Sequence, residues 1–403
     1  YGAAARHFLD LWGDTENFSD DALTDAGLIV DAMFGAGLDR PIVGEFDKIV
    51  RQTNKLNRPV VAVDVPSGIC GETGQVLGVA IQASSTVSFF RFKPGHFLYP
   101  GRARCGDLVL GQIGIADHMA KAVGAKCEVN AFQSNWLQVS ETDHKYSKGH
   151  CLVVGGELHK TGASRMSAQS ALRAGAGLVS VQAAPEIAEE FANHLTAEMI
   201  KSEPLDALLA DTRYRSIVVG PGCGVNDGTH HNVLTSLAAN RAIVLDADAL
   251  SIFESDPAEL FDHIANNSSE VVLTPHGGEF NRLFPNVLLE SDKVDAARQA
   301  ANMAGAVVVM KGADTVIAAP DGRLRINANA PHWLATAGSG DVLAGVIGAF
   351  LARGLEKFDA ASAGVYLHGL AAQKYGGQGM IATDLIDMLP HALRALSKEL
   401  KTS

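Results

Sequence analysis

The chain has 403 residues, of which 47% are hydrophobic and 6% aromatic, and its formal net charge is −12 at pH 7. This length suits two or three domains, and the 41 glycines together with abundant aliphatic residues are typical of α/β proteins. The acidic balance excludes a general nucleic-acid or membrane surface, which needs clustered Lys and Arg, and the absence of a long apolar run or signal peptide favours a cytoplasmic protein.

The first part of the chain predicts an N-terminal helix and then strands of a mostly parallel sheet. The helix is expected in "YGAAARHFLDLWGD" at 1–14. Short β-branched runs separated by helical stretches are typical of parallel sheets. These runs occupy 27–35, 58–68, 84–90 and 106–115.

A polar stretch at about 116–147 interrupts the apolar strands and indicates a domain boundary. A second series of continuous apolar runs follows, which predicts strands buried between two helix layers. The predicted strands lie in 150–156, 177–185, 216–224, 241–250, 269–280 and 306–320, with helices at 163–176, 228–240 and 293–304. The Asp321-Gly322 pair within 319–326 predicts a hairpin.

The five cysteines are an odd number, widely scattered, and form no C-x-x-C pair. Neither a disulfide framework nor a zinc site is expected from this spacing.

The stretch "LATAGSGDVLAG" at 334–345 places a carboxylate, Asp341, in a glycine-rich turn that runs into an apolar helix. Unpaired N–H groups at a helix start attract phosphate, and Gly338 and Gly340 let a ligand approach the backbone closely. Asp341 is then either an ordinary acid of a first helical turn or a base that removes a proton from a hydroxyl attacking a phosphoryl group.

Other chemistry-bearing residues follow the later strands, in "GPGCG", "DADAL", "TPHGGEF" and "KGADT". Ligands of open α/β sheets bind outside the carboxyl ends of the strands, so these segments are expected on one edge. Lys311 is either a phosphate ligand or a solvated strand-end lysine. Asp246 and Asp248 either position Mg²⁺ or a ribose or cap a helix, and they stay outside the predicted catalytic set.

At this point the sequence resembles a known family. The segments "HKTGASRMSAQSALRAGAGLVSV", "VVGPG", "VLDADAL", "LTPHGGEF", "VVMKGADTVI" and "ATAGSGDVLAG" are similar to the ADP/ATP-dependent NAD(P)H-hydrate dehydratases of the ribokinase-like superfamily, over nearly all of 145–398. The resemblance implies that Asp341 is the catalytic base, which activates the hydroxyl at carbon 6 of the hydrated ring for phosphorylation and elimination.

The first part resembles the NAD(P)H-hydrate epimerase domain, through "LIVDAMFGAGLDRPIVGEF", "PVVAVDVPSGICGETG", "TVSFFRFKPG" and "GRARCGDLVLGQIGI". The two resemblances together imply a bifunctional repair enzyme with two three-layer α/β/α domains, an incomplete Rossmann-like epimerase domain followed by a ribokinase-like domain. The expected division is an epimerase domain at 1–118, a linker at 119–144 and a dehydratase domain at 145–403.

Two further groups of residues in the dehydratase half are carried over from the family. The adenylate-binding positions are Lys311, Gly312, Ala313, Asp314, Thr315 and Gly340. The positions that line the hydrated-dinucleotide site, together with Asp341, are Ala163, Gly224 and His276. Without the resemblance, His276 would be a packed or capping histidine.

In the epimerase half, the resemblance implies that Asp64 is an acid or base at the hydrated carbon and that Asp31 and Ser67 bind potassium. Oxygen ligands suit a hard cation, while a strand-end carboxylate without an ion is the alternative for Asp31. The substrate-contacting loop comprises Gly35, Ala36, Gly37, Leu38, Asp39, Arg40 and Pro41. Family members carry an "NGGDG"-type phosphate and potassium loop before the tyrosine that aligns with Tyr1, so the epimerase domain is expected to lack its start.

The implied cofactors are ADP or ATP as phosphoryl donor, Mg²⁺ and K⁺, and the implied substrates are hydrated NADH and NADPH. A homo-oligomer is expected from the resemblance. Two alternatives stay open: a kinase of the same fold that phosphorylates a vitamin-like alcohol, and a first domain that only binds or oligomerises.

Overall fold

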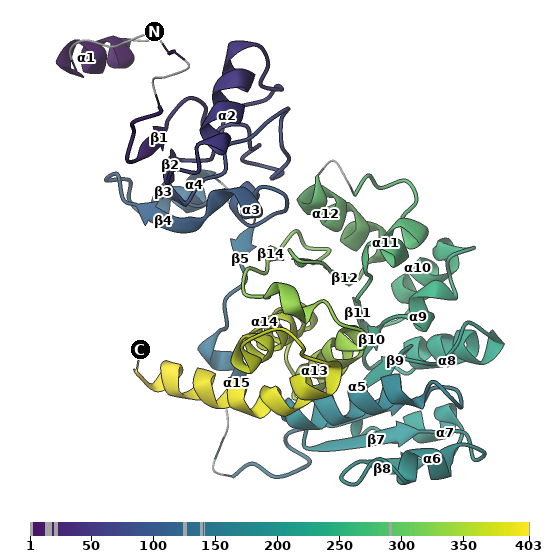
Figure 1. Ribbon diagram of the computed structural model, residues 1–403. Helices are drawn as coiled ribbons and strands as arrows, with labels where there is room; N and C mark the ends of the chain where they lie inside the picture. The colour runs from purple at the N-terminus through teal and green to yellow at the C-terminus, as the bar shows by residue number, and fades with distance from the viewer. Residues whose placement is uncertain are drawn as a thin grey trace. The chain divides into compact units, whose positions relative to one another are not determined.

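The computed structural model describes residues 3–12, 18–19, 23–123, 127–137, 140, 142–289 and 292–402. The chain divides into two compact units, 1–116 and 117–403 (Figure 1). Each unit contains its own sheet, so each is described by itself.

The first unit contains a four-stranded parallel sheet in the order β1-β2-β3-β4. Each strand lies inside a run that the sequence predicts, and the predicted N-terminal helix is present as α1, Ala3–Trp12. The strands are β1 Ile29–Asp31, β2 Val60–Val63, β3 Ser85–Phe89 and β4 Asp107–Gly111; the other helices are α2 Glu45–Lys55, the 3₁₀ turn η1 Pro94–His96 and α3 Arg102–Cys105.

The two faces of this sheet differ in burial. One face packs Ile29, Val60 and Ala62 against Val50 of α2 in a small core. On the other face, Val30 is 61% exposed and Val109 is 49% exposed. Within the described residues, this second face of the sheet is therefore partly exposed at its two edge strands.

The second unit contains a ten-stranded sheet in the order β5-β14-β13-β12-β11-β10-β9-β6-β7-β8. The sheet is parallel except at β13, which pairs antiparallel with both β12 and β14 and confirms the predicted hairpin. The strands are β5 Glu128–Val129, β6 His150–Val154, β7 Leu178–Gln182, β8 Met199–Lys201, β9 Tyr214–Val219, β10 Ala242–Leu245, β11 Glu270–Leu273, β12 Val307–Met310, β13 Val316–Ala318 and β14 Leu324–Ile326.

Helices lie on both faces of this sheet, as the buried strands predict (Figure 1). Alternate strand residues such as Val153, Val218 and Val244 share a core with α5, α13, α14 and α15, because successive side chains of a strand point to opposite faces. The helices are α4 His118–Val123, α5 Thr161–Arg173, α6 Ala188–Ala192, α7 Leu205–Leu209, α8 Asp227–Ala238, α9 Asp248–Ser251, α10 Pro257–Ala265, α11 Gly277–Leu283, α12 Lys293–Ala304, α13 Ser339–Ala352, α14 Lys357–Tyr375 and α15 Ala382–Thr402, with 3₁₀ turns η2 Ser134–Leu137 and η3 His332–Leu334.

The segment expected as a linker, 119–144, contributes to the second unit. Its strand β5 pairs with β14 at the edge of the sheet, and Trp136 is buried in the core beside Phe132. The segment is mostly polar, so its composition does not predict these contacts. One short edge strand and one buried aromatic side chain are enough to attach it to the second unit.

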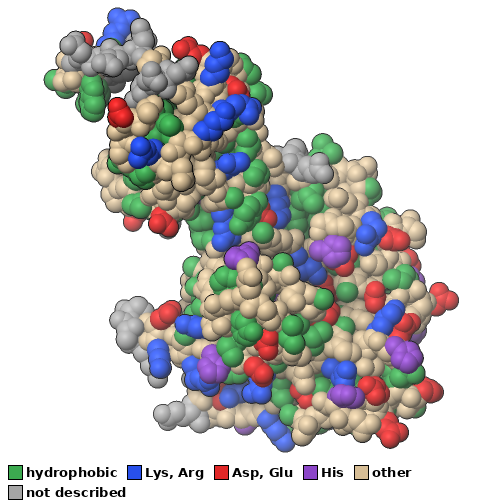
Figure 2. Space-filling model, viewed as in Figure 1, with side chains coloured by type: hydrophobic (Ala, Val, Ile, Leu, Met, Phe, Trp, Pro, Cys, Tyr) green, Lys and Arg blue, Asp and Glu red, His purple; other side chains and the backbone are tan. Residues whose placement is uncertain are grey.

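Acidic and basic side chains are interspersed over the visible face of the second unit (Figure 2). Within the described part of the chain, no helix is long and apolar enough to cross a membrane. None of the five cysteines, all of which lie among the described residues, forms a disulfide.

Candidate active sites

Helix α13 begins at a glycine that the structure requires. Gly338, its N-cap, has φ of 85°, and a Cβ there would lie 2.7 Å from the Met166 Cε atom. The next residue, Ser339, accepts a hydrogen bond at its carbonyl from His368 Nε2 (2.9 Å). Burial lowers the pKa of His368 to about 4, so the ring is neutral and can hold the first turn without adding charge.

Close packing on α5 fixes the position of Asp341 in this first turn. Ser167 Oγ donates to the Asp341 carbonyl (2.8 Å) and Ser170 Oγ donates to the Val342 carbonyl (3.0 Å). Gly345 lies so close to α5 that a Cβ would meet the Ser167 carbonyl oxygen at 2.0 Å. The acid is thus placed by tertiary contacts between two helices that are distant in sequence.

The environment of Asp341 raises the proton affinity of its carboxylate. Burial, followed by the negative charge of Asp246, raises the pKa of Asp341 to about 7, although the Lys311 ammonium opposes the shift. A carboxylate with a pKa near the working pH suits a general base, because it is ionised often enough to act and basic enough to accept a proton.

Lys311 lies beside this carboxylate and among others. Its Nζ donates to Asp246 Oδ1 (2.6 Å) and lies 3.9 Å from Glu279 Oε2. Burial alone lowers the pKa of Lys311, but Asp246 and Glu279 outweigh it, so the net pKa is above the ordinary value and the ammonium stays charged. A Cβ on Gly340 would lie 3.4 Å from this ammonium, which places the charge directly beside the start of α13.

The carboxylates of Asp246 and Asp248, which follow β10, contact different partners. Between them Ala247 has φ of 49°, a conformation that L-residues rarely adopt and that is often found at functional sites. Asp246 accepts from Thr274 Oγ1 (2.8 Å) as well as Lys311, and Asp248 accepts from the Gly224 N–H (2.8 Å). Asp246, left outside the predicted catalytic set, therefore belongs to the network around Asp341.

Gly224 and Ala163 lie around one loop. A Cβ on Gly224 would overlap the Glu157 carboxylate at 2.3 Å, and a Cβ on Gly222 would lie 3.2 Å from the Ala163 Cβ. Glycine is required here because the loop after β9 crosses the start of α5 at close range.

His276 is the N-cap of α11. Its Nδ1 accepts from the N–H groups of Gly278 (2.9 Å) and Glu279 (3.3 Å), and the Glu279 carboxylate accepts from the His276 N–H (2.8 Å). The capping interpretation is confirmed. Its ring is nonetheless 56% exposed, so the Nε2 edge can also meet a ligand.

The segment from Lys311 to Thr315 is held in place by its own contacts. Thr315 Oγ1 donates to the Gly312 carbonyl (3.0 Å), and the buried Asp314 pairs with Lys293 of α12. The Lys311 side chain points away from this turn toward Asp246. Thus Lys311, rather than Asp314, contributes charge to the region around Asp341.

In the first unit, Asp64 follows β2 with φ of 69°. Its carboxylate pairs with the Lys93 ammonium and accepts from Ser88 Oγ (3.3 Å) and the Ala36 N–H (3.3 Å). Lys93 Nζ also donates to Ser88 Oγ (3.0 Å). The arrangement places an acid and an ammonium in contact at the carboxyl end of the sheet.

The charges of this pair are maintained by their mutual contact. Burial alone raises the pKa of Asp64, but the hydrogen bond and charge of Lys93 outweigh burial and hold the pKa below its usual value. His96 Nε2 donates to the Asp64 carbonyl (2.8 Å) and His96 Nδ1 accepts from the Lys93 N–H (2.9 Å), so the ring orients both residues.

Asp31 and Ser67, the predicted potassium ligands, are in direct contact. Ser67 donates to the Asp31 carboxylate from its N–H (2.7 Å) and its Oγ (2.6 Å), and its Oγ also lies 3.2 Å from the Phe34 carbonyl. Burial raises the pKa of Asp31 despite these bonds. Asp31 is 3% exposed, and its carboxylate, the Ser67 hydroxyl and the Phe34 carbonyl form an all-oxygen set of the kind that a hard cation prefers.

The predicted substrate loop, 35–41, contacts Asp64 only at its first residues. The Ala36 N–H contacts the carboxylate, and a Cβ on Gly35 would lie 3.4 Å from Asp64 Oδ2. From Gly37 to Pro41 the residues are largely exposed.

Sequence reasoning missed Lys93, Glu279 and the role of Asp246. Lys93 lies in "RFKPGH", a segment of basic and aromatic residues whose composition does not indicate that Lys93 contacts Asp64, 29 residues earlier. The position of Asp246 directly after a buried strand was the available signal.

The second unit has a mostly parallel sheet. At the carboxyl edge of this sheet lie a helix start with a glycine N-cap, an acid with a raised pKa and a buried lysine. These features are typical of nucleotide-dependent α/β enzymes of the ribokinase-like class.

The comparisons identify the family. Residues 151–391 match the family model described as NAD(P)H-hydrate dehydratase, and residues 4–95 match that of the YjeF-related protein N-terminus. The bifunctional NAD(P)H-hydrate repair enzymes Nnr of Thermofilum pendens (36% identical, 93% of this chain and 74% of the relative) and Escherichia coli (35%, 90% and 70%) are similar over most of their length. The chain belongs to the family of bifunctional NAD(P)H-hydrate repair enzymes.

Solved structures agree for the second unit. An ADP/ATP-dependent NAD(P)H-hydrate dehydratase from Bacillus subtilis, co-crystallized with ATP and Mg²⁺ and soaked with CoA, is 25% identical with a TM-score of 0.58, over 67% of this chain and 99% of that one. The same Bacillus enzyme with ATP and Mg²⁺ is 28% identical with a TM-score of 0.56, over 64% and 93%. A ribokinase-like superfamily protein from Enterococcus faecalis, 22% identical with a TM-score of 0.57 over 67% and 96%, shares the fold.

Proposed function

We propose that this chain repairs NADH and NADPH that are hydrated on the nicotinamide ring. Its second unit dehydrates the S-hydrate with ADP or ATP as phosphoryl donor, and its first unit interconverts the R- and S-hydrates. The observation that carries the proposal is Asp341, whose pKa is about 7, in the first turn of α13 beside Gly340 and Lys311.

In the dehydration, the Asp341 carboxylate removes the proton from the hydroxyl at carbon 6, and the hydroxyl oxygen attacks the terminal phosphoryl group of the nucleotide. With ADP the leaving group is AMP. The carbon–oxygen bond then breaks, inorganic phosphate leaves, and loss of a proton from carbon 5 forms the double bond of the reduced ring. The N–H groups at the start of α13 and the Lys311 ammonium offset the charge on the transferring group.

The nucleotide is proposed to lie along Lys311, Gly312, Ala313, Asp314 and Thr315 and against Gly340. Mg²⁺ bound with it would neutralise phosphate charge. Asp246 and Asp248, which follow β10 on the same edge, carry the hard oxygen donors that such an ion prefers. Ala163, Gly224 and His276 are proposed to line the hydrated ring.

In the first unit, epimerisation inverts carbon 6 by loss and return of its hydroxyl. The Lys93 ammonium protonates the departing hydroxyl, which leaves as water while the ring nitrogen lone pair forms an iminium. Asp64 takes a proton from water as it adds to the other face. The loop Gly35–Pro41 is proposed to hold the dinucleotide, and Asp31 and Ser67 to bind K⁺. Homo-oligomerisation stays a prediction from the resemblance, and a cytoplasmic location stays a prediction from the sequence.

The test supplies purified chain with Mg²⁺, ADP and separated hydrates of NADPH. The S-hydrate is expected to return the absorbance of the reduced ring, with one AMP and one phosphate released for each NADPH. The R-hydrate is expected to be consumed faster than it epimerises spontaneously. No recovery of NADPH from the S-hydrate would refute the dehydratase proposal, and consumption of the R-hydrate only at the spontaneous rate would refute the epimerase proposal.

A further inference from the structure

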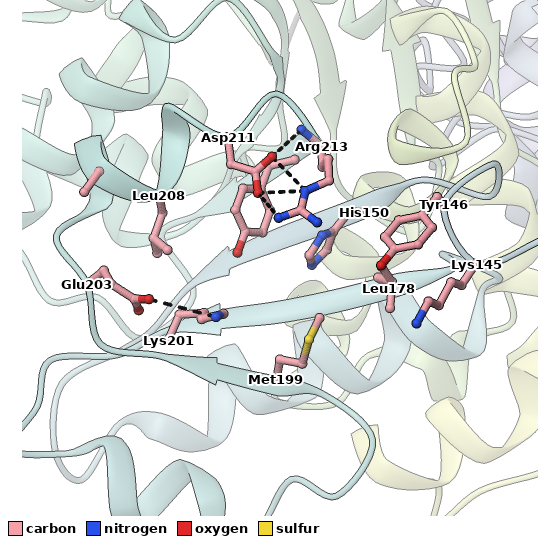
Figure 3. Close-up of a pocket in the computed structure, with 12 residues that line it drawn as sticks. Lys145, Tyr146, His150, Leu178, Met199, Lys201, Glu203, Leu208, Asp211 and Arg213 are labelled. Atoms are coloured by element: carbon pink, nitrogen blue, oxygen red, sulfur yellow. Dashed lines mark hydrogen bonds and ion pairs between the residues drawn. The ribbon is translucent and has the colours of Figure 1, made fainter.

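A cavity of about 370 Å³ opens at the amino ends of the strands in the second unit. Its floor is formed by His150, Leu178 and Tyr214, the first residues of β6, β7 and β9, which are paired with one another across the sheet. Figure 3 shows side chains from these strands, from β8 and from the segment after α7 gathered around one space. We call this cavity the amino-edge pocket.

The amino-edge pocket is separate from the candidate dehydratase site. Strands β6 and β9 run from the pocket to the loops that hold Glu157 and Gly224. Because each residue of a strand advances about 3.3 Å, the five or six residues of these strands set the two edges roughly 17–20 Å apart. A ligand in the pocket would not contact Asp341.

The floor of the pocket is aromatic and uncharged. The rings of His150 and Tyr214 have centroids 4.3 Å apart, and His150 Nε2 lies 2.9 Å from Ser180 Oγ. Burial lowers the pKa of His150 to about 4, so this imidazole is neutral at physiological pH. Tyr146 (46% exposed) and Met199 (38% exposed) add aromatic and thioether surface that remains open to a ligand.

Two ammonium groups line the pocket: that of Lys201 forms a long ion pair, and that of Lys145 lies over an aromatic ring. Arg213 is neutralised by Asp211, with contacts of 2.6 to 3.0 Å from its guanidinium. Lys201 lies 3.9 Å from Glu203, beyond hydrogen-bond distance. Lys145 has no carboxylate partner among the described residues and lies over the Tyr146 ring, 5.2 Å from its centroid. The lining thus carries Lys145, Lys201 and Arg213 against Glu203 and Asp211, an excess of one positive charge, in a chain whose net charge is −12.

We propose that the amino-edge pocket binds a small aromatic anion of the size of a nucleoside monophosphate. Its volume lies at the lower end of the ~300–1,000 Å³ typical of small-molecule sites. A planar ring packs against Tyr146, Met199 and the floor. The anionic group pairs with the ammonium group of Lys145 or of Lys201, which lie on different sides of the space in Figure 3.

The experiment uses the full chain with its catalytic nucleotide site saturated by a non-hydrolysable ATP analogue and Mg²⁺, and titrates AMP by calorimetry. One AMP is expected to bind per chain, and the double variant Lys145→Ser, Lys201→Ser is expected to bind at least 10-fold more weakly. Lys374→Ser, which removes an exposed lysine of α14, is the matched control and should leave the affinity unchanged.

Two further titrations test the parts of the ligand. Adenosine and inorganic phosphate alone should each bind more weakly than AMP. Absence of AMP binding once the catalytic site is filled, or equal affinity for AMP in wild type and the double variant, would overturn the proposal. Equal affinity for phosphate and AMP would overturn the assignment of an aromatic ligand.

Discussion

Replacing Asp341 with Asn should lower turnover and raise stability at the same time. Asn keeps the size of the side chain and, because the described contact between this residue and α5 uses the backbone carbonyl, it keeps that contact as well. The substitution removes the base. A positioned general base contributes about 10²- to 10⁴-fold, so turnover of the S-hydrate should fall at least ~10²-fold, or about 2.7 kcal/mol in activation free energy.

The stability change follows from the raised pKa of Asp341. The folded-state value, about 7, lies above the model value of 3.8 for an unfolded chain, so the folded state binds this proton more tightly. The resulting stabilisation is complete below pH 3.8 and is lost as pH rises through 7. At pH 8 the ionised wild-type carboxylate therefore destabilises the fold, by at most about 4 kcal/mol for a shift of this size. Asn cannot ionise and avoids this cost.

The assays are NADPH recovery under saturating ADP and thermal unfolding of the full chain at pH 5 and pH 8. Asp341→Asn should unfold at a higher temperature than wild type at pH 8, and the difference should shrink at pH 5. Glu189→Gln, an exposed acid in the first turn of α6, serves as control for both readouts. Turnover within 10-fold of wild type, or a lower unfolding temperature at pH 8, would refute the reasoning.

Three other outcomes are expected. The dehydratase rate should rise with pH through about 7 as Asp341 ionises. Asp246→Asn should move the midpoint of this pH profile to lower pH, because it removes a negative charge that raises the Asp341 pKa. An unchanged midpoint in the rate profile of the variant would contradict this expectation. Gly345→Ala should destabilise the second unit by about 1–3 kcal/mol in urea unfolding, since its Cβ would meet a carbonyl of α5 at 2.0 Å, while Gly377→Ala, with nothing within 4 Å, should be close to neutral. K⁺, compared with tetramethylammonium, should raise the unfolding temperature of wild type, and Asp31→Asn should abolish this increment.

Much of the second unit was predictable from its sequence. Buried parallel strands are continuous runs of Val, Ile and Leu. This local signal predicts the strands β6, β9, β10 and β12. The glycine turn before α13 is likewise local. The segment 119–144 was harder, because the contacts of β5 and Trp136 lie with residues about 200 positions later.

Sequence alone determined the α/β class, the placement of the loops that follow the strands on one sheet edge and the presence of an acid at the start of a helix, since each depends on residues adjacent in the chain. Only the tertiary structure decided that Lys311 meets Asp246, that Lys93 meets Asp64 and that burial lifts the Asp341 pKa to about 7. These properties arise from distance and desolvation between segments remote in sequence, and no local pattern records them.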